Sequence, residues 1–276
     1  SNDTSLNYIG DSSKFYNHRI GIETRGSSSQ SFPKKPYGFF TVDSAGADSN
    51  TSLIGLPSEH AWELNATYDD KSLMRDVLTY ELARRTGRYA TRWKYLELFI
   101  NGKYQGIYIL MEKVKRDANR VDISKLKLED TTGNNLTGGY IVKIDKTTGN
   151  YSGGWTDSFP TYPGSPARVF FQYDYPEAAA MAPQQRAYIQ NYIYLFENAL
   201  AGSQFTSPTA GYRQYADVSS FIDYSIMNEI SKNVDGYRLS TYLYKDKDSK
   251  GGKLTMGPIW DFYLAWNNAD YNNSSI

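Results

Sequence analysis

Short runs of alternating apolar and polar residues dominate the first half of the chain and predict β-strands. These strands are expected over residues 19–25, 37–40, 93–100, 106–111 and 138–145. Asn101-Gly102 separates two of them, and this pair is typical of a tight hairpin turn. The stretch 149–183 is rich in Gly, Pro and Tyr, and it predicts an irregular region with one strand, over 168–173.

Apolar residues at helical spacing predict one helix in the first half and two in the second. The first runs from a cap at Asp69 or Asp70 to Thr86, with Leu73, Val77, Leu78 and Leu82 as its apolar stripe. The other two cover 183–202 and, after a cap at Asp217, residues 218–230. Short strands are expected over 240–244 and 253–259.

This order of elements predicts an α+β protein with two lobes. A β-rich N-terminal lobe with one helix covers residues 1–145, an irregular connecting region covers 146–182, and a helix-rich C-terminal lobe covers 183–276. The 276 residues are enough for such a pair of lobes.

Composition narrows the functional classes. The 30 basic and 30 acidic residues balance, which argues against a nucleic-acid partner. The absence of cysteine excludes disulfides, thiolate metal sites and cysteine nucleophiles. No apolar run approaches the roughly 20 residues that a membrane-spanning helix needs. The 25 tyrosines and many small polar residues favour a secreted or surface protein.

A local basic excess lies in residues 84–127, which hold twelve basic and four acidic side chains, a net charge of 12 − 4 = +8. A solvated surface is one interpretation, and a docking face for an acidic or phosphorylated partner is the other.

Four stretches in order resemble the CotH (spore coat protein H) kinase-like family, and the branch found in gut Bacteroidetes, whose members are exported. They are residues 25–37, 70–75, 104–113 and the pair 233–238 and 257–262. The resemblance implies an atypical protein-kinase-like fold, use of ATP with Mg²⁺ or Mn²⁺, and phosphorylation of serine in protein substrates such as spore-coat proteins. Relatives continue past the last stretch with more helices, so a chain that ends at Ile276 would have a truncated second lobe.

Asp261 and Ser240 are the candidate metal ligands. Asp261 follows a short apolar strand and stands between Trp260 and Phe262, as the metal-binding aspartate of kinases does before its Phe-Gly. A turn-capping aspartate is the alternative. Many relatives have Asp-x-Asp here, whereas this chain has Tyr263 in place of the second acid. Ser240 lies where kinases place a metal-binding asparagine.

Asp235 and Arg238 are the candidate catalytic residues. Asp235 follows a helix end and resembles the kinase aspartate that orients the acceptor hydroxyl, although Asp235-Gly236 is also ordinary turn chemistry. Arg238 is expected either to clamp a phosphate or to pair with Asp235.

Five further residues are expected to bind the nucleotide. Lys35 lies after the small-residue loop, in the kinase order of loop and then lysine, while Lys34 should point the other way. Arg25 precedes that loop, and Ser27 lies within it. Glu81 is expected to pair with the lysine, and Glu112 to meet the adenine or ribose; a surface glutamate and an ion pair with Lys113 or Arg116 are the respective alternatives.

The sequence thus predicts an ATP- and metal-dependent, kinase-like phosphotransferase that acts on protein Ser or Thr outside the cytoplasm, secreted or surface-anchored. The alternative is a catalytically inactive, pseudokinase-like surface binding or structural protein. A carbohydrate-binding module is a third, weaker hypothesis. Oligomeric state stays open.

Overall fold

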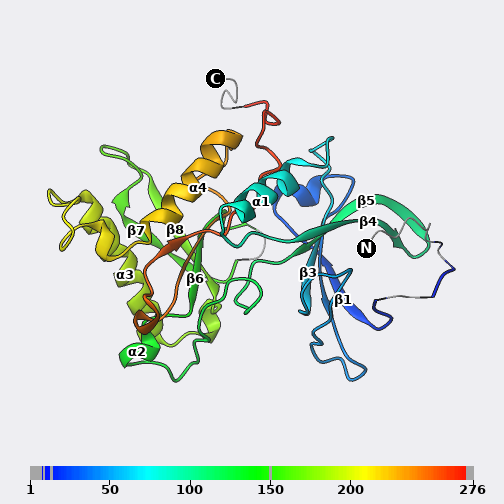
Figure 1. Cartoon of the computed structure of the whole chain (residues 1–276), viewed down its shortest axis with the longest axis horizontal. Helices are drawn as coiled ribbons and strands as arrows, with labels where there is room; N and C mark the ends of the chain where they lie inside the picture. The colour runs from blue at the N-terminus through cyan, green and yellow to red at the C-terminus, as the bar shows by residue number, and fades with distance from the viewer. Residues whose placement is uncertain (1–7, 9, 13–14, 149–150, 272–276) are drawn as a thin grey trace.

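The computed structural model describes residues 8, 10–12, 15–148 and 151–271. The described chain forms two five-stranded antiparallel sheets, four α-helices and short 3-10 turns (Figure 1). The predicted α+β composition is therefore confirmed.

The first sheet has the strand order β1-β2-β3-β5-β4. Its members are β1 (Ile20–Thr24), β2 (Tyr37–Thr41), β3 (Ala61–Asn65), β4 (Trp93–Ile100) and β5 (Lys103–Glu112). The pattern did not predict β3, although β3 is the central strand, paired with β2 and β5. Trp62, Glu63 and Leu64 are all buried, so both faces of β3 are covered and no apolar–polar alternation marks it.

The second sheet has the order β10-β9-β6-β8-β7. Its members are β6 (Tyr140–Ile144), β7 (Gly154–Pro160), β8 (Arg168–Tyr175), β9 (Thr241–Lys245) and β10 (Thr255–Met256). This sheet corrects one expectation, because residues 146–182 contain two strands where one was expected. Gly154 and Pro160 argued against a strand at β7, but an edge strand tolerates both residues. β6, placed in the first lobe by sequence, pairs with β8 and β9.

The helices are α1 (Arg75–Arg85), α2 (Gly133–Leu136), α3 (Pro183–Ala201) and α4 (Val218–Ser231). α3 and α4 match the predicted spans closely. α1 begins later than predicted, because Leu73 takes a left-handed conformation at φ 60°. The Asp70 carboxylate accepts the backbone N–H groups of Ser72 and Arg75, at 3.0 and 2.9 Å, so it caps the loop that leads into the helix.

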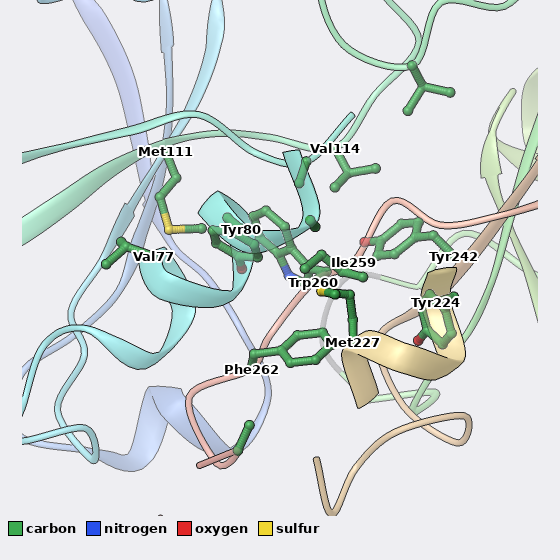
Figure 2. Close-up of a cluster of buried hydrophobic side chains, with 14 of the residues drawn as sticks. Val77, Tyr80, Met111, Val114, Tyr224, Met227, Tyr242, Ile259, Trp260 and Phe262 are labelled. Atoms are coloured by element: carbon green, nitrogen blue, oxygen red, sulfur yellow. The ribbon is translucent and has the colours of Figure 1, made fainter. Parts of the chain in front are cut away.

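A buried apolar cluster lies between the two sheets and holds the segment 259–262 in place (Figure 2). Tyr80 of α1, Met111 of β5 and Met227 of α4 meet Trp260 and Phe262 there. The buried face of α1 includes Val77 of the predicted stripe, at 4% exposure, but differs from the stripe elsewhere. Tyr80 is fully buried, whereas Leu78 is 40% exposed. This shared core fixes the position of the residues that follow Ile259.

Candidate functional site

A cleft opens between the first sheet, the start of α1 and the edge of the second sheet. It encloses about 1210 Å³, counting the solvent at its mouth. Its walls come from the loop 25–29, the segment 65–69, α1, residues 143–148, and two late segments, 235–240 and 260–263.

Asp261 projects into this cleft from a strained turn. Its φ of 68° is unusual for a residue with a side chain. Its N–H donates to the Tyr80 hydroxyl at 3.2 Å, and the Ser240 hydroxyl donates to its carboxylate at 3.2 Å. Burial raises the pKa of Asp261 to about 6, against the opposing charge of Arg25 and with support from Asp145. The two predicted metal ligands, Asp261 and Ser240, therefore lie side by side.

A second acid, Asp76, lies beside them and was not predicted. It belongs to the first turn of α1 and is 1% exposed. One carboxylate oxygen accepts the Phe262 N–H at 2.6 Å, and the other accepts the Asn65 side-chain amide at 2.9 Å. Burial, and next the charge of Asp261, raise the pKa of Asp76 to about 7. In sequence Asp76 looks like an ordinary first-turn acid that favours the helix dipole.

Asp235 lines the same cleft from the loop that follows α4. Buried Asn228 shapes this loop by accepting the Asn233 amide at 3.0 Å, and Asn233 in turn accepts the Asp235 N–H at 3.2 Å. Gly236 is required, since an added Cβ would lie 2.5 Å from the Asn228 side-chain oxygen. Arg238 is 53% exposed and forms an ion pair with Asp235, which is one of its two predicted roles.

Arg25 lines the same cleft, and its charge acts on Asp261. Its guanidinium lies 2.7 Å from a carboxylate oxygen of buried Glu63 in β3 and 5.6 Å from the centre of the Trp260 ring. Burial alone would lower the pKa of Arg25, but the charges of Glu63 and Asp261 outweigh it and raise the pKa. Arg25 is therefore anchored by Glu63 of β3.

The small-residue loop contacts the segment that follows β6, the central strand of the second sheet. The Ser27 and Thr148 hydroxyls are 2.7 Å apart, and both residues line the cleft. Lys143 and Lys146, which sequence reasoning missed, add positive charge from this side. Both lie at the end of β6, where the charged run Lys143-Ile144-Asp145-Lys146 was the sequence signal that could have found them.

Lys34, and not Lys35, lines the cleft. The Lys34 ammonium donates to the Ile107 carbonyl and lies 4.5 Å from the centre of the Tyr108 ring. Burial, and then the charge of Lys71, lower the pKa of Lys34. Lys35 instead donates to the Gln30 carbonyl at 2.7 Å. The prediction that one of the two faces the cleft was right, but the choice between them was wrong.

Glu81 and Glu112 lie away from the cleft, so their predicted nucleotide contacts are corrected. Glu81 is on the outer surface of α1, where it forms ion pairs with Arg84 and Arg85. Glu112 is fully buried and receives three hydrogen bonds from Arg92, at 2.8 to 3.0 Å. Its role is to neutralise charge inside the core.

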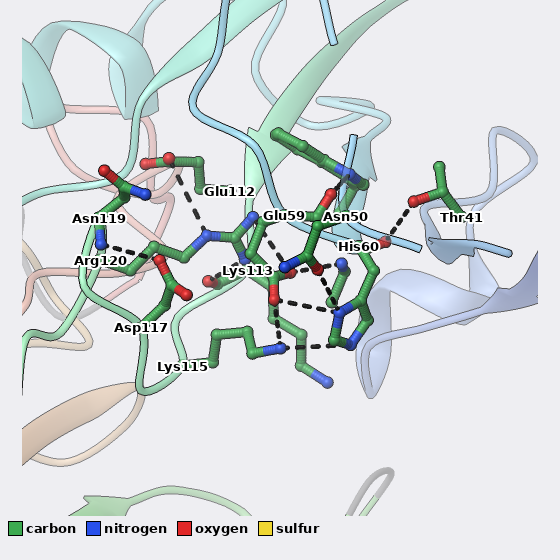
Figure 3. Close-up of polar contacts among 12 residues, drawn as sticks. Thr41, Asn50, Glu59, His60, Glu112, Lys113, Lys115, Asp117, Asn119 and Arg120 are labelled. Carbon is green, nitrogen blue, oxygen red and sulfur yellow. Dashed lines mark hydrogen bonds and ion pairs between the residues drawn. The ribbon is translucent and has the colours of Figure 1, made fainter. Parts of the chain in front are cut away.

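The basic excess of residues 84–127 is partly matched by acids from elsewhere in the chain. Arg88 forms ion pairs with Asp217 and Asp223, at 3.1 and 2.7 Å. Lys115 lies 2.7 Å from Glu59 (Figure 3). The stretch is therefore much less positive in the fold than its sequence indicates.

The donor set fits a hard divalent cation that arrives with a phosphate. Within the described ranges, no three His, Cys, Asp or Glu residues are grouped to hold a metal by themselves. Mg²⁺ is usually held by one or two carboxylates together with phosphate oxygens, and Asp76 with Asp261 supplies that number of carboxylates. The same described part of the chain has no helix long and apolar enough to cross a membrane.

Two antiparallel sheets, with buried acids and several cations around one cleft, define a mixed α/β protein suited to a charged ligand. The family described as CotH kinase protein matches residues 22–276, so the chain belongs to that family. The chain is also 24% identical, over 247 residues, to the inner spore coat protein H of Bacillus subtilis (strain 168). That alignment covers 90% of this chain and 59% of the relative. The expected Bacteroidetes branch stays a prediction.

Proposed function

We propose that this chain is an ATP- and Mg²⁺- or Mn²⁺-dependent phosphotransferase that acts on Ser or Thr of a protein substrate. The observation that carries the proposal is the meeting of Asp235, Asp261 and Arg25 at one cleft, although 236 residues separate the first and last in sequence: 261 − 25 = 236. Phosphoryl transfer needs positioning and charge neutralisation more than covalent chemistry, and this cleft offers both signs of charge.

Each side chain has a separate task in this proposal. Asp261 and Ser240 hold the cation, which when bound neutralises phosphate charge. Arg25 and Lys34 neutralise phosphate oxygens from the first-sheet side, and the loop at Ser27 covers them. Asp235 accepts a hydrogen bond from the acceptor hydroxyl, and its ion pair with Arg238 fixes the direction of the carboxylate.

The same proposal includes a kinase-like arrangement of two lobes, with the first sheet and α1 on one side of the cleft and the second sheet with α3 and α4 on the other. Membership in the CotH kinase family supports it. Action outside the cytoplasm is supported by the B. subtilis relative, which is described as a spore coat protein. The chain spans 59% of that relative, so its substrates are a separate question for this protein.

Labelled phosphate transfer is the direct test. The protein is incubated with γ-labelled ATP, Mn²⁺ and casein as a generic acceptor, and incorporation into casein and into the protein itself is counted. Wild type and the exposed variant Glu81→Gln should incorporate label. Asp261→Asn and Asp235→Asn should lose it by at least about 100-fold, the lower end of the range for a positioned acid–base group. Absence of both label and an ATP-induced rise in Tm contradicts the proposal.

An inactive, nucleotide-binding protein is the second candidate. Tyr263 lines the cleft two residues after Asp261, where the family resemblance implies a second acid in many relatives, and this tyrosine favours the second candidate. An ATP-induced rise in Tm with no transfer to any acceptor selects this candidate over the first.

A further inference from the structure

Asp76 carries a buried carboxylate whose charge no basic side chain matches. It is 1% exposed and lines the cleft. None of the ion pairs formed within the described part of the chain includes it. Its neighbour Arg75 pairs with Asp70 instead. Buried charges in proteins are paired or coordinate metals, because an uncompensated one costs several kcal/mol. An ionised Asp76 would therefore need a cation from outside the polypeptide, and without one it would take up a proton.

The hydrogen bonds of Asp76 fix the direction of its carboxylate but leave an acceptor position on each oxygen. The Phe262 N–H and the Asn65 amide each donate to a different oxygen. The Asn65 carbonyl oxygen accepts the Thr67 N–H at 3.1 Å, which fixes the direction of the amide. An ionised carboxylate accepts about four hydrogen bonds or metal contacts, so each oxygen keeps one position. Fixed outer hydrogen bonds of this kind are typical of metal-ligand carboxylates.

The backbone contact also places Asp76 next to Asp261. The Phe262 N–H belongs to the peptide that joins residues 261 and 262, so the Asp76 carboxylate abuts the turn that carries Asp261. Segment 260–263 contains a single acid, because residue 263 is tyrosine. Helix α1 brings the second acid to the same wall from elsewhere in the chain.

We infer that Asp76 is the second carboxylate ligand of the divalent cation in this cleft, with Asp261 as the first. The ligand class is a hard divalent cation that carries phosphate oxygens. The inference rests on the proposed function for the identity of the cleft, but it concerns cation binding and not transfer.

Binding of Mn²⁺ in the presence of ADP tests this assignment, with free Mn²⁺ counted by electron paramagnetic resonance. Asp76→Asn keeps the shape of the side chain and an acceptor for the Phe262 N–H but removes the charge. We expect it to weaken Mn²⁺ binding at least about tenfold, since even outer-shell changes cost 10–100-fold. Asp69→Asn, which removes another cleft-lining acid, should change the affinity less than about twofold.

A measurement on the unaltered protein covers the case in which Asp76→Asn does not fold. Bound Mn²⁺ should broaden the NMR signal of the Asn65 side-chain amide, which donates to Asp76. Unchanged Mn²⁺ affinity in Asp76→Asn, or an unbroadened Asn65 amide in Mn²⁺-loaded wild type, overturns the assignment and leaves the proposed function standing. Loss of Mn²⁺ binding in Asp76→Asn supports the assignment even if wild type transfers no phosphate.

Discussion

Replacing Arg25 should make the protein less stable, because the buried carboxylate of Glu63 loses its cationic partner. Glu63 is 3% exposed, and the Arg25 guanidinium lies 2.7 Å from its carboxylate. Two unit charges about 4 Å apart interact by about 4 kcal/mol at an effective dielectric of 20. Breaking one side of a buried pair costs about 3–5 kcal/mol in measured cases. We therefore expect Arg25→Met to lower the free energy of unfolding by about 3 kcal/mol at pH 7.

The pH dependence of this loss follows from the direction of the Glu63 pKa. Burial raises that pKa, against the charges of Arg25 and nearby lysines. Without Arg25 the folded-state pKa rises further above the unfolded value of 4.5. Folded Glu63 then holds its proton more tightly, so stability falls as the pH rises above about 4.5. The loss in Arg25→Met should accordingly be smaller at pH 5 than at pH 7.

A double variant separates the structural from the functional role of Arg25. Arg25→Met with Glu63→Leu removes both charges, and such apolar replacements of buried pairs are often neutral. It should unfold within about 1 kcal/mol of wild type, yet bind ATP as weakly as Arg25→Met. Urea unfolding followed by tryptophan fluorescence gives the stabilities, with exposed Arg85→Met as the control. A loss below about 1 kcal/mol in Arg25→Met, or a double variant as unstable as the single, refutes this reasoning.

Three further predictions concern other charged groups. Burial and Asp157 raise the pKa of Glu197 from 4.5 to about 9, so the free energy of unfolding falls as the pH rises from 4.5 towards 9. Glu197→Gln should therefore raise the free energy of unfolding, measured in urea, by about 1–2 kcal/mol at pH 8 and little at pH 5, a value discounted for partial exposure. Arg120→Met removes a second, more distant cation from buried Glu59 and Glu112, which keep Lys115 and Arg92, so it should lower stability by about 1–2 kcal/mol, and no measurable loss in urea unfolding contradicts this. Lys34→Ala should weaken ATP binding about tenfold by calorimetry and Lys35→Ala less than twofold, an order whose reversal would contradict the placement of Lys34 in the cleft.

Local pattern was enough for elements that short-range contacts specify. The hairpin of β4 and β5 follows from strand alternation on both sides of Asn101-Gly102, which take φ values of 51° and 74°. Helices α3 and α4 follow from their apolar spacing. Asp235 and Asp261 were found because each sits in a short stretch that resembles a known family.

The local pattern could not predict strand β3, nor which of the two adjacent lysines faces the cleft. β3 is buried on both faces, so its sequence carries no alternation to read. Lys34 and Lys35 are adjacent and chemically identical, and the register of the preceding loop alone decides which one faces the cleft.

By itself, the sequence determined the mixed α/β composition, the short-range elements and the two acids in recognisable motifs. Only the tertiary structure decided that Glu63 anchors Arg25 and that Asp76 meets the Phe262 amide 186 residues away. The reason is physical: periodicity along a chain reports how much of each residue is buried, whereas a charged partner is chosen by the packing of distant elements around a shared core.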